Sequence, residues 1–101
     1  MPLKGKLIHP TEDPKEFELP DGREGSKEIN RLLDEAVGQE HCCIEFVHLA
    51  HRGVAMIVDG EGLLKELPQN LIASELYGGH IAGPALVFDH AEFMQWDETL
   101  E

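Results

Sequence analysis

Basic residues are scarce in this sequence, and their scarcity excludes one large class of partner. Lys and Arg together number 8 against 20 Asp and Glu, which gives a formal net charge of −12 at pH 7. A surface of that sign repels a phosphate backbone and attracts cationic partners. We therefore expect no direct binding to nucleic acid, and we expect basic or cationic partners.

Cysteine and long apolar runs are scarce as well. The only cysteines are neighbours, Cys42 and Cys43, and adjacent cysteines cannot form an ordinary unstrained disulfide with each other. We therefore expect reduced thiols and a cytoplasmic protein. No apolar run is long enough to cross a bilayer, and residues 1–6 lack the apolar core of a signal peptide. We predict no membrane partner.

The chain does contain enough apolar residues for one core. Its 101 residues predict a single domain at residues 1–88, followed by an acidic C-terminal tail at residues 89–101, with no internal repeat or linker. Every Lys and Arg lies at or before Lys65, so the last third of the chain is uniformly negative. Such a surface either serves solubility, or docks a basic protein, or mimics nucleic acid.

The hydrophobic pattern predicts an α+β fold, in which one main helix packs on a face of a small, mostly antiparallel sheet of about five strands. We expect this helix over residues 27–37, because Ser26 suits the capping position and a stripe of apolar residues follows at helical spacing, namely Ile29, Leu32, Leu33, Ala36 and Val37. Strands are expected over residues 5–9, 16–19, 42–49, 54–59 and 80–88, with a further edge strand over residues 63–67.

The second half of the chain predicts two more features. Residues 71–77 suit a short helix that Asn70 caps and Gly78 ends. Pro84 lies inside the last predicted strand, and because proline cannot donate to a ladder, we expect that strand at an edge of the sheet or with a bulge. In the tail, aromatic and apolar residues recur at helical spacing among acids, which is typical of either a docked helix or a frayed end.

Segments spread over residues 3–88 follow a recognisable order. They are Leu7–Pro10, Val37–Gly38 leading into Ile44–Val47, Val54–Asp59, Glu61–Leu64, Leu67–Asn70, Ala73–Gly78 and Ile81–Val87. In that order they resemble an uncharacterised family of small phage, plasmid and bacterial domains, the domain of unknown function 3846. Residues 39–43 and the acidic tail depart from the family pattern. The resemblance implies a mobile-element origin and interaction with host machinery.

The densest group of side chains that bind zinc is His41, Cys42 and Cys43, followed by His48 and His51. Their spacing matches no ordinary zinc finger or ribbon, and alternate residues of a strand point to opposite faces. A thiol nucleophile would need a converging base and cationic surroundings, whereas this chain is acidic. We therefore predict no metal, no cofactor and no catalytic residue, and we expect buried, inert cysteines.

A few residues are predicted to contact a partner or ligand. Two acids flank a glycine turn, where a solvated hairpin is the alternative. An asparagine begins the short helix, and it either orients a ligand or only caps the helix. Two aromatic residues of the tail either anchor a partner or fold back onto the core. With one tyrosine, the set is Asp59, Glu61, Asn70, Tyr77, Phe93 and Trp96.

These observations predict a non-enzymatic accessory protein of phage or mobile-element origin that binds a host protein or small effector through an acidic α+β surface. Two alternatives stay open. One is an acidic mimic of nucleic acid that inhibits a host defence system. The other is a module that sequesters a nucleotide signal, which would need Arg23, Arg31 or Arg52 to gather locally. Because exposed strand edges invite pairing, a homodimer is a further expectation.

Overall fold

The structure is a computed structural model that describes residues 2–38, 43–62 and 64–98. The elements of the described residues, in chain order, are β1 (Leu3–Ile8), β2 (Lys15–Leu19), α1 (Gly22–Val37), β3 (Ile44–Leu49), the 3-10 turn η1 (Ala50–Arg52), β4 (Val54–Asp59), α2 (Leu71–Tyr77), β5 (Ala85–Asp89) and α3 (His90–Asp97). The predicted α+β class is confirmed.

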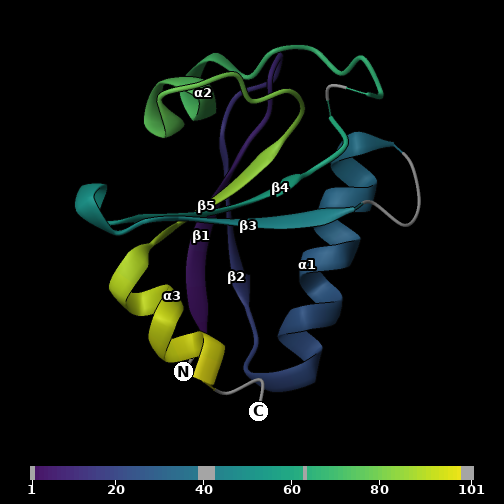
Figure 1. Ribbon diagram of the computed structural model, residues 1–101. Helices are drawn as coiled ribbons and strands as arrows, with labels where there is room; N and C mark the ends of the chain where they lie inside the picture. The colour runs from purple at the N-terminus through teal and green to yellow at the C-terminus, as the bar shows by residue number, and fades with distance from the viewer. Residues whose placement is uncertain (1, 39–42, 63, 99–101) are drawn as a thin grey trace.

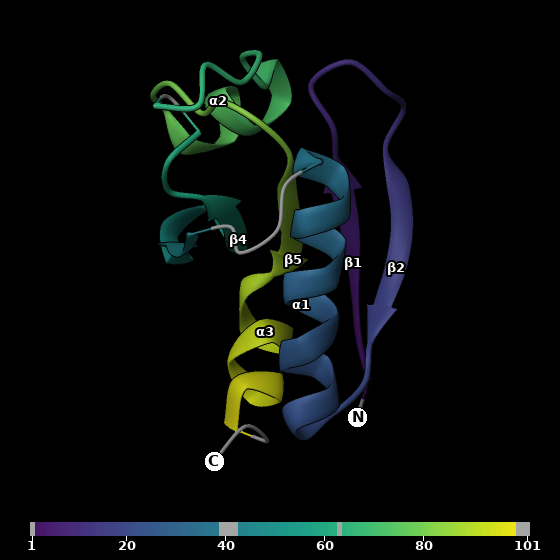
Figure 2. The ribbon, with the colours of Figure 1, turned by 90° about the vertical axis from the view of Figure 1, so that its right-hand side faces the viewer.

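All of these strands join one twisted antiparallel sheet in the order β2-β1-β5-β4-β3 (Figure 1). The last strand in the sequence, β5, lies at the centre, where it pairs with β1 on one side and β4 on the other. The edges are β2 and β3, and α1 connects them along one face of the sheet (Figure 2). Both halves of the chain therefore depend on β5 to form one sheet.

Two strand predictions are wrong. The strand predicted over residues 80–88 begins only at Ala85, and it lies in the interior of the sheet rather than at an edge. Pro84 comes immediately before that strand, so its missing N–H removes no ladder bond. Residues 64–66 form turns and Leu67 lies outside any strand, because local bonds hold this segment: the Lys65 N–H donates to the Glu61 carbonyl at 3.0 Å, and the Leu67 N–H to that of Gly62 at 3.0 Å.

Helix α1 begins at Gly22, more than a turn before the predicted span of residues 27–37, so Ser26 lies inside the helix rather than at its cap. The added turn contains Gly25, which is buried so tightly that a Cβ there would collide with the Pro20 carbonyl and the Trp96 indole. Glycine disfavours helices by about 1 kcal/mol. This long-range contact accounts for the glycine, and sequence periodicity could not reveal it.

Apolar side chains pack on both faces of the sheet. Helices α1 and α3 cover one face, over a core of Leu3, Leu19, Ile29, Leu33, Ala55, Ile57, Leu86, Phe88, Phe93 and Trp96. The short helix α2 and the segment before β5 cover one end of the other face, over Leu49, Met56, Val58, Ala73, Ile81 and Ala85. No helix in the described residues has the length and apolar character needed to span a membrane.

Residues 90–97 of the predicted acidic tail form α3, which packs against the sheet. Trp96 is buried, and its Nε1–H donates to the Pro20 carbonyl at 2.9 Å, which ties this helix to the chain just before α1. At the other end, the Asp89 carboxylate caps the helix by accepting from the Glu92 N–H at 3.0 Å. Of the two alternatives for the tail, a docked helix or a frayed end, residues 90–97 therefore form the docked helix.

Candidate functional site

Asn70 lies inside the molecule, with only 1% of its surface exposed. Its Nδ2 donates to the carbonyls of Ile8 at 2.7 Å and Gly83 at 3.0 Å, while its Oδ1 accepts from the Ala73 N–H at 3.1 Å. Both amide hydrogens are used in this way. Of the two predicted roles, these contacts match the helix cap, and they add a clamp that joins β1, α2 and the loop before β5.

Asp59 is buried rather than placed in a solvated hairpin. One carboxylate oxygen accepts from the Glu61 N–H at 2.9 Å, and the other accepts from the Lys65 Nζ at 2.7 Å. The Asp59 side chain is fully covered, whereas that of Lys65 keeps 21% of its surface exposed. The pair closes the turn after β4, and the Glu61 side chain itself stays at the surface.

Tyr77 and Asp59 are predicted site residues that border the same hollow, together with other polar side chains. The hollow has a volume of about 140 Å³ and is lined in part by Tyr77, Glu45 and His80, with Asp59 contributing to its wall. It is small and open to solvent, and its own acids outnumber its cations. The structure thus brings Tyr77 and Asp59 to one place, apart from Phe93 and Trp96.

Phe93 and Trp96 are core residues. Their rings lie 5.8 Å apart, and Phe93 also packs 5.4 Å from Phe88 in the central strand. Of the two predicted roles, folding back onto the core is the one that the structure shows. Neither ring is exposed enough to anchor a partner, although Phe93 supports two side chains that are.

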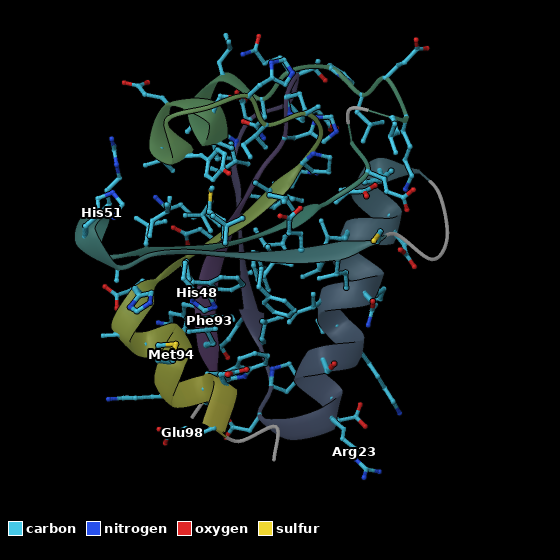
Figure 3. The ribbon with its side chains drawn as sticks, in the orientation of Figure 1. Arg23, His48, His51, Phe93, Met94 and Glu98 are labelled. Carbon is cyan, nitrogen blue, oxygen red and sulfur yellow. The ribbon has the colours of Figure 1, made fainter. Side chains whose placement is uncertain are left out.

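The side chains able to bind zinc, for which no metal was predicted, are spread out wherever the structure describes them. His41 and Cys42 lie outside the described residues, and Cys43 is exposed, which corrects the expected burial of this thiol. His48 lies on β3 and packs 5.6 Å from His90, while His51 lies beyond it in η1 (Figure 3). Within the described ranges, no group of three or more His, Cys, Asp or Glu side chains is placed to hold a metal.

An exposed surface between β3 and α3 is the feature that the sequence analysis missed. Phe46 is 49% exposed and Met94 is 42% exposed. Phe46 and His48 rest on the buried Phe93, with ring centroids 6.2 and 5.9 Å away. Figure 3 shows Met94 beside Phe93 on α3, with Glu98 just beyond the C-terminal end of that helix. We call Phe46, His48, Met94 and Glu98 the β3–α3 surface.

Carboxylates around α3 have no basic neighbours in the sequence. The acids of this segment are Asp89, Glu92, Asp97 and Glu98, and no Lys or Arg follows Lys65. On α1, by contrast, Arg31 pairs with Glu28 and reaches the Glu35 carboxylate at 2.8 Å. The hydrogen bond and charge of Glu28, with a further contribution from Glu35, raise the pKa of Arg31 above its usual value. Acids on α1 therefore have a basic partner on the same helix, whereas α3 contains no Lys or Arg.

A hollow of about 770 Å³ lies on the part of the sheet face that α2 leaves open. It contains Lys4 and Lys6, which stand opposite Glu18 and Glu16 in the neighbouring strand. None of the three arginines proposed to gather around a nucleotide lines this hollow, since Arg23 and Arg31 lie on α1 and Arg52 lies in η1. An open hollow of mixed charge favours no anionic ligand.

Comparison with models of protein families, with curated proteins and with solved structures gave no significant match. The resemblance to the domain of unknown function 3846 therefore stays a prediction.

Proposed function

We propose that this protein is a non-enzymatic accessory protein of a phage or other mobile element, and that it binds a basic segment of a host protein through the β3–α3 surface. The observation that carries the proposal is the combination on one surface of two half-exposed apolar side chains, Phe46 and Met94, with the acids of α3, a helix that contains no Lys or Arg. The proposed origin rests on the family resemblance alone.

The apolar part supports a protein partner. Aromatic side chains and methionine are enriched at protein interfaces, where a few of them contribute most of the binding energy. One side of the Phe46 ring packs on the buried Phe93. Phe46 therefore presents a ring to solvent without losing much further side-chain freedom on binding. A rigid aromatic residue of this kind lowers the entropic cost of association.

The charged part supports a basic partner. Asp97 and Glu98 lie at the C-terminal end of α3, where the helix dipole is negative and further negative charge is unfavourable. Placing acids there lowers the stability of the helix, so solubility alone explains them poorly. Attraction to a cationic segment gives these carboxylates a role, and it also raises the rate of encounter.

A titration with a basic peptide of alternating lysine and leucine tests the proposal. We expect isothermal titration calorimetry to show binding that weakens steeply as salt is raised, because the Debye length falls from about 30 Å at 0.01 M to about 10 Å at 0.1 M. Met94→Ser and Glu98→Gln together should weaken binding at least about tenfold, through loss of an apolar contact and a charge.

The matched control is Leu71→Ser with Glu18→Gln, which removes an exposed leucine and an exposed acid far from the β3–α3 surface. This control should bind as the wild type does. Equal affinity of both double variants for the peptide would refute the proposed surface. Turnover of nucleotides, peptides or esters by the purified protein at enzymatic rates would refute the non-enzymatic role.

A further inference from the structure

We propose that β3 pairs with β3 of a second copy of this chain, antiparallel about a two-fold axis at Phe46, to form a dimer with a continuous sheet. The inference uses the backbone edge of β3 rather than the acids of α3, so it stands independently of the proposed function. The partner is a second copy of the chain, to which the exposed edge, the register and the opposed side chains of β3 all point.

The two edges of the sheet differ in how they are protected. In β2, Lys15, Glu16 and Glu18 are charged and exposed, as is usual for an edge that avoids pairing. In β3, Glu45 is the only Asp, Glu, Lys or Arg. The strand order places β3 at one edge of the sheet, with β4 as its neighbour there. The β3 edge therefore offers a strand with little charge to oppose a partner strand.

The outward backbone groups of β3 can be assigned from its pairing with β4. The Gly60 N–H donates to the Cys43 carbonyl at 2.7 Å, which marks their pair as hydrogen-bonded. In an antiparallel ladder such pairs alternate with non-hydrogen-bonded pairs, whose N–H and C=O groups point away from the partner. The residues of β3 with outward N–H and C=O groups are therefore Ile44, Phe46 and His48.

The other side of β4 gives the same assignment. The His90 N–H donates to the Gly53 carbonyl at 2.9 Å, so by alternation Ala55 and Ile57 direct their backbone groups toward β5. Their neighbours Val54, Met56 and Val58 then direct theirs toward β3, where they meet Leu49, Val47 and Glu45. The two observations agree that alternate residues of β3 direct their backbone N–H and C=O groups away from β4.

A two-fold axis at Phe46 uses every one of these outward residues. Phe46 then stands opposite Phe46 of the second copy, and Ile44 stands opposite His48, which gives about six hydrogen bonds between the chains. Glu45 stands opposite Val47, so no like charges face each other. Moving the axis by one residue toward Glu45 would place two carboxylates opposite each other, and moving it toward Val47 would leave Ile44 unpaired.

Amide hydrogen exchange tests this register directly. As protein concentration rises, the amides of Ile44, Phe46 and His48 should become protected, while those of Glu45 and Val47 should be protected at all concentrations by β4. This alternate pattern is the signature of pairing along the edge. Uniform protection of β3, or no dependence on concentration, would overturn the proposal.

Sedimentation equilibrium of two variants provides the second test. His48→Pro removes the outward N–H without removing a ladder bond to β4, and it should weaken dimerisation at least about tenfold. His48→Ala is the matched control, because it removes the imidazole and keeps the N–H, and it should dimerise more tightly than His48→Pro. If His48→Pro fails to fold, Phe46→Lys provides an edge charge like that of β2 and should give a monomer.

Salt separates this proposal from the proposed function. Raising salt should strengthen the dimer, because screening weakens repulsion between two chains of formal charge −12, whereas it should weaken binding of a basic peptide. A wild-type protein that stays monomeric at high salt and high concentration would refute the dimer and leave peptide binding untouched. Equal self-association of His48→Pro and His48→Ala would also refute it.

Discussion

At the scale of single residues, the polar side chains that the sequence marked as recognition residues hold the fold together. Asn70 connects three segments through the nitrogen and the oxygen of its side-chain amide, and Asp59 accepts hydrogen bonds on both carboxylate oxygens. A buried polar group is stable only when its hydrogen bonds are satisfied. Both residues meet that condition within the protein, which leaves them few groups with which to contact a ligand.

Substitution of Asn70 measures the strength of this clamp. Asn70→Ser keeps an oxygen for the helix cap but leaves the carbonyls of Ile8 and Gly83 without donors, so we expect a loss of about 1–3 kcal/mol in the free energy of unfolding. Asn70→Asp should be more damaging at neutral pH, because a buried carboxylate would face two carbonyl oxygens.

Urea unfolding monitored by circular dichroism gives both values. The Asp variant should regain stability as the pH is lowered, since a protonated carboxyl can donate to one of the carbonyls. Gln69→Ser, at the exposed neighbouring position, is the control and should change little. If both Asn70 variants unfold at the wild-type urea concentration, the clamp contributes nothing to stability.

At the level of elements, α3 combines a favourable N-terminal cap with acids at its C-terminal end, where negative charge is unfavourable. Asp89 and Glu92 lie at its N-terminal end, where negative charge is favourable, and Glu98 follows its C-terminal end. The apolar stripe through Phe93 and Trp96 keeps the helix in place despite this. Packing on the core, rather than helix propensity, therefore stabilises α3.

The same chemical change at the two ends of α3 should have opposite effects. Glu98→Gln should raise the free energy of unfolding by about 0.3–1 kcal/mol, and Glu92→Gln should lower it by a similar amount, because the helix dipole changes sign along the axis. Thermal and urea unfolding at low ionic strength measure the difference. A change of the same sign in both variants would show that net charge, not the dipole, dominates.

At the scale of the whole molecule, the charge is the dominant feature. A formal charge of −12 on a chain of 101 residues repels itself most strongly in the compact state. The ion pairs on α1 offset part of this repulsion, because Lys27 and Arg31 lie next to the acids of that helix. The carboxylates after Lys65 have no such partners in the sequence.

We therefore expect the midpoint of thermal unfolding to rise with sodium chloride up to about 0.15 M, where the Debye length is about 8 Å. Neutralising Asp97 and Glu98 should flatten this dependence, because their repulsion is what the salt screens. Neutralising Glu28 and Glu35 should not flatten it, because both pair with Arg31. A midpoint that falls with salt would mean that attractive pairs outweigh repulsion in this protein.

Features that depend on neighbours in sequence were predicted well. The short helix at residues 71–77, its cap at Asn70 and its end at Gly78 are as expected, and so is the strand at residues 54–59. The start of α1 was missed, because its first turn depends on the contact of Gly25 with Trp96. The edge position or bulge expected for the last strand was wrong, because Pro84 stands before β5, which pairs in continuous register on both sides.

Composition sets the net charge and the number of apolar residues available for a core, and the local order of residues sets the period of each segment. Contacts across the sheet, by contrast, place β5 at the centre and β3 at an edge, and they leave Phe46 and Met94 exposed while Phe93 and Trp96 are buried. The reason is that strand order and burial arise from contacts between residues far apart in sequence, which local patterns do not encode.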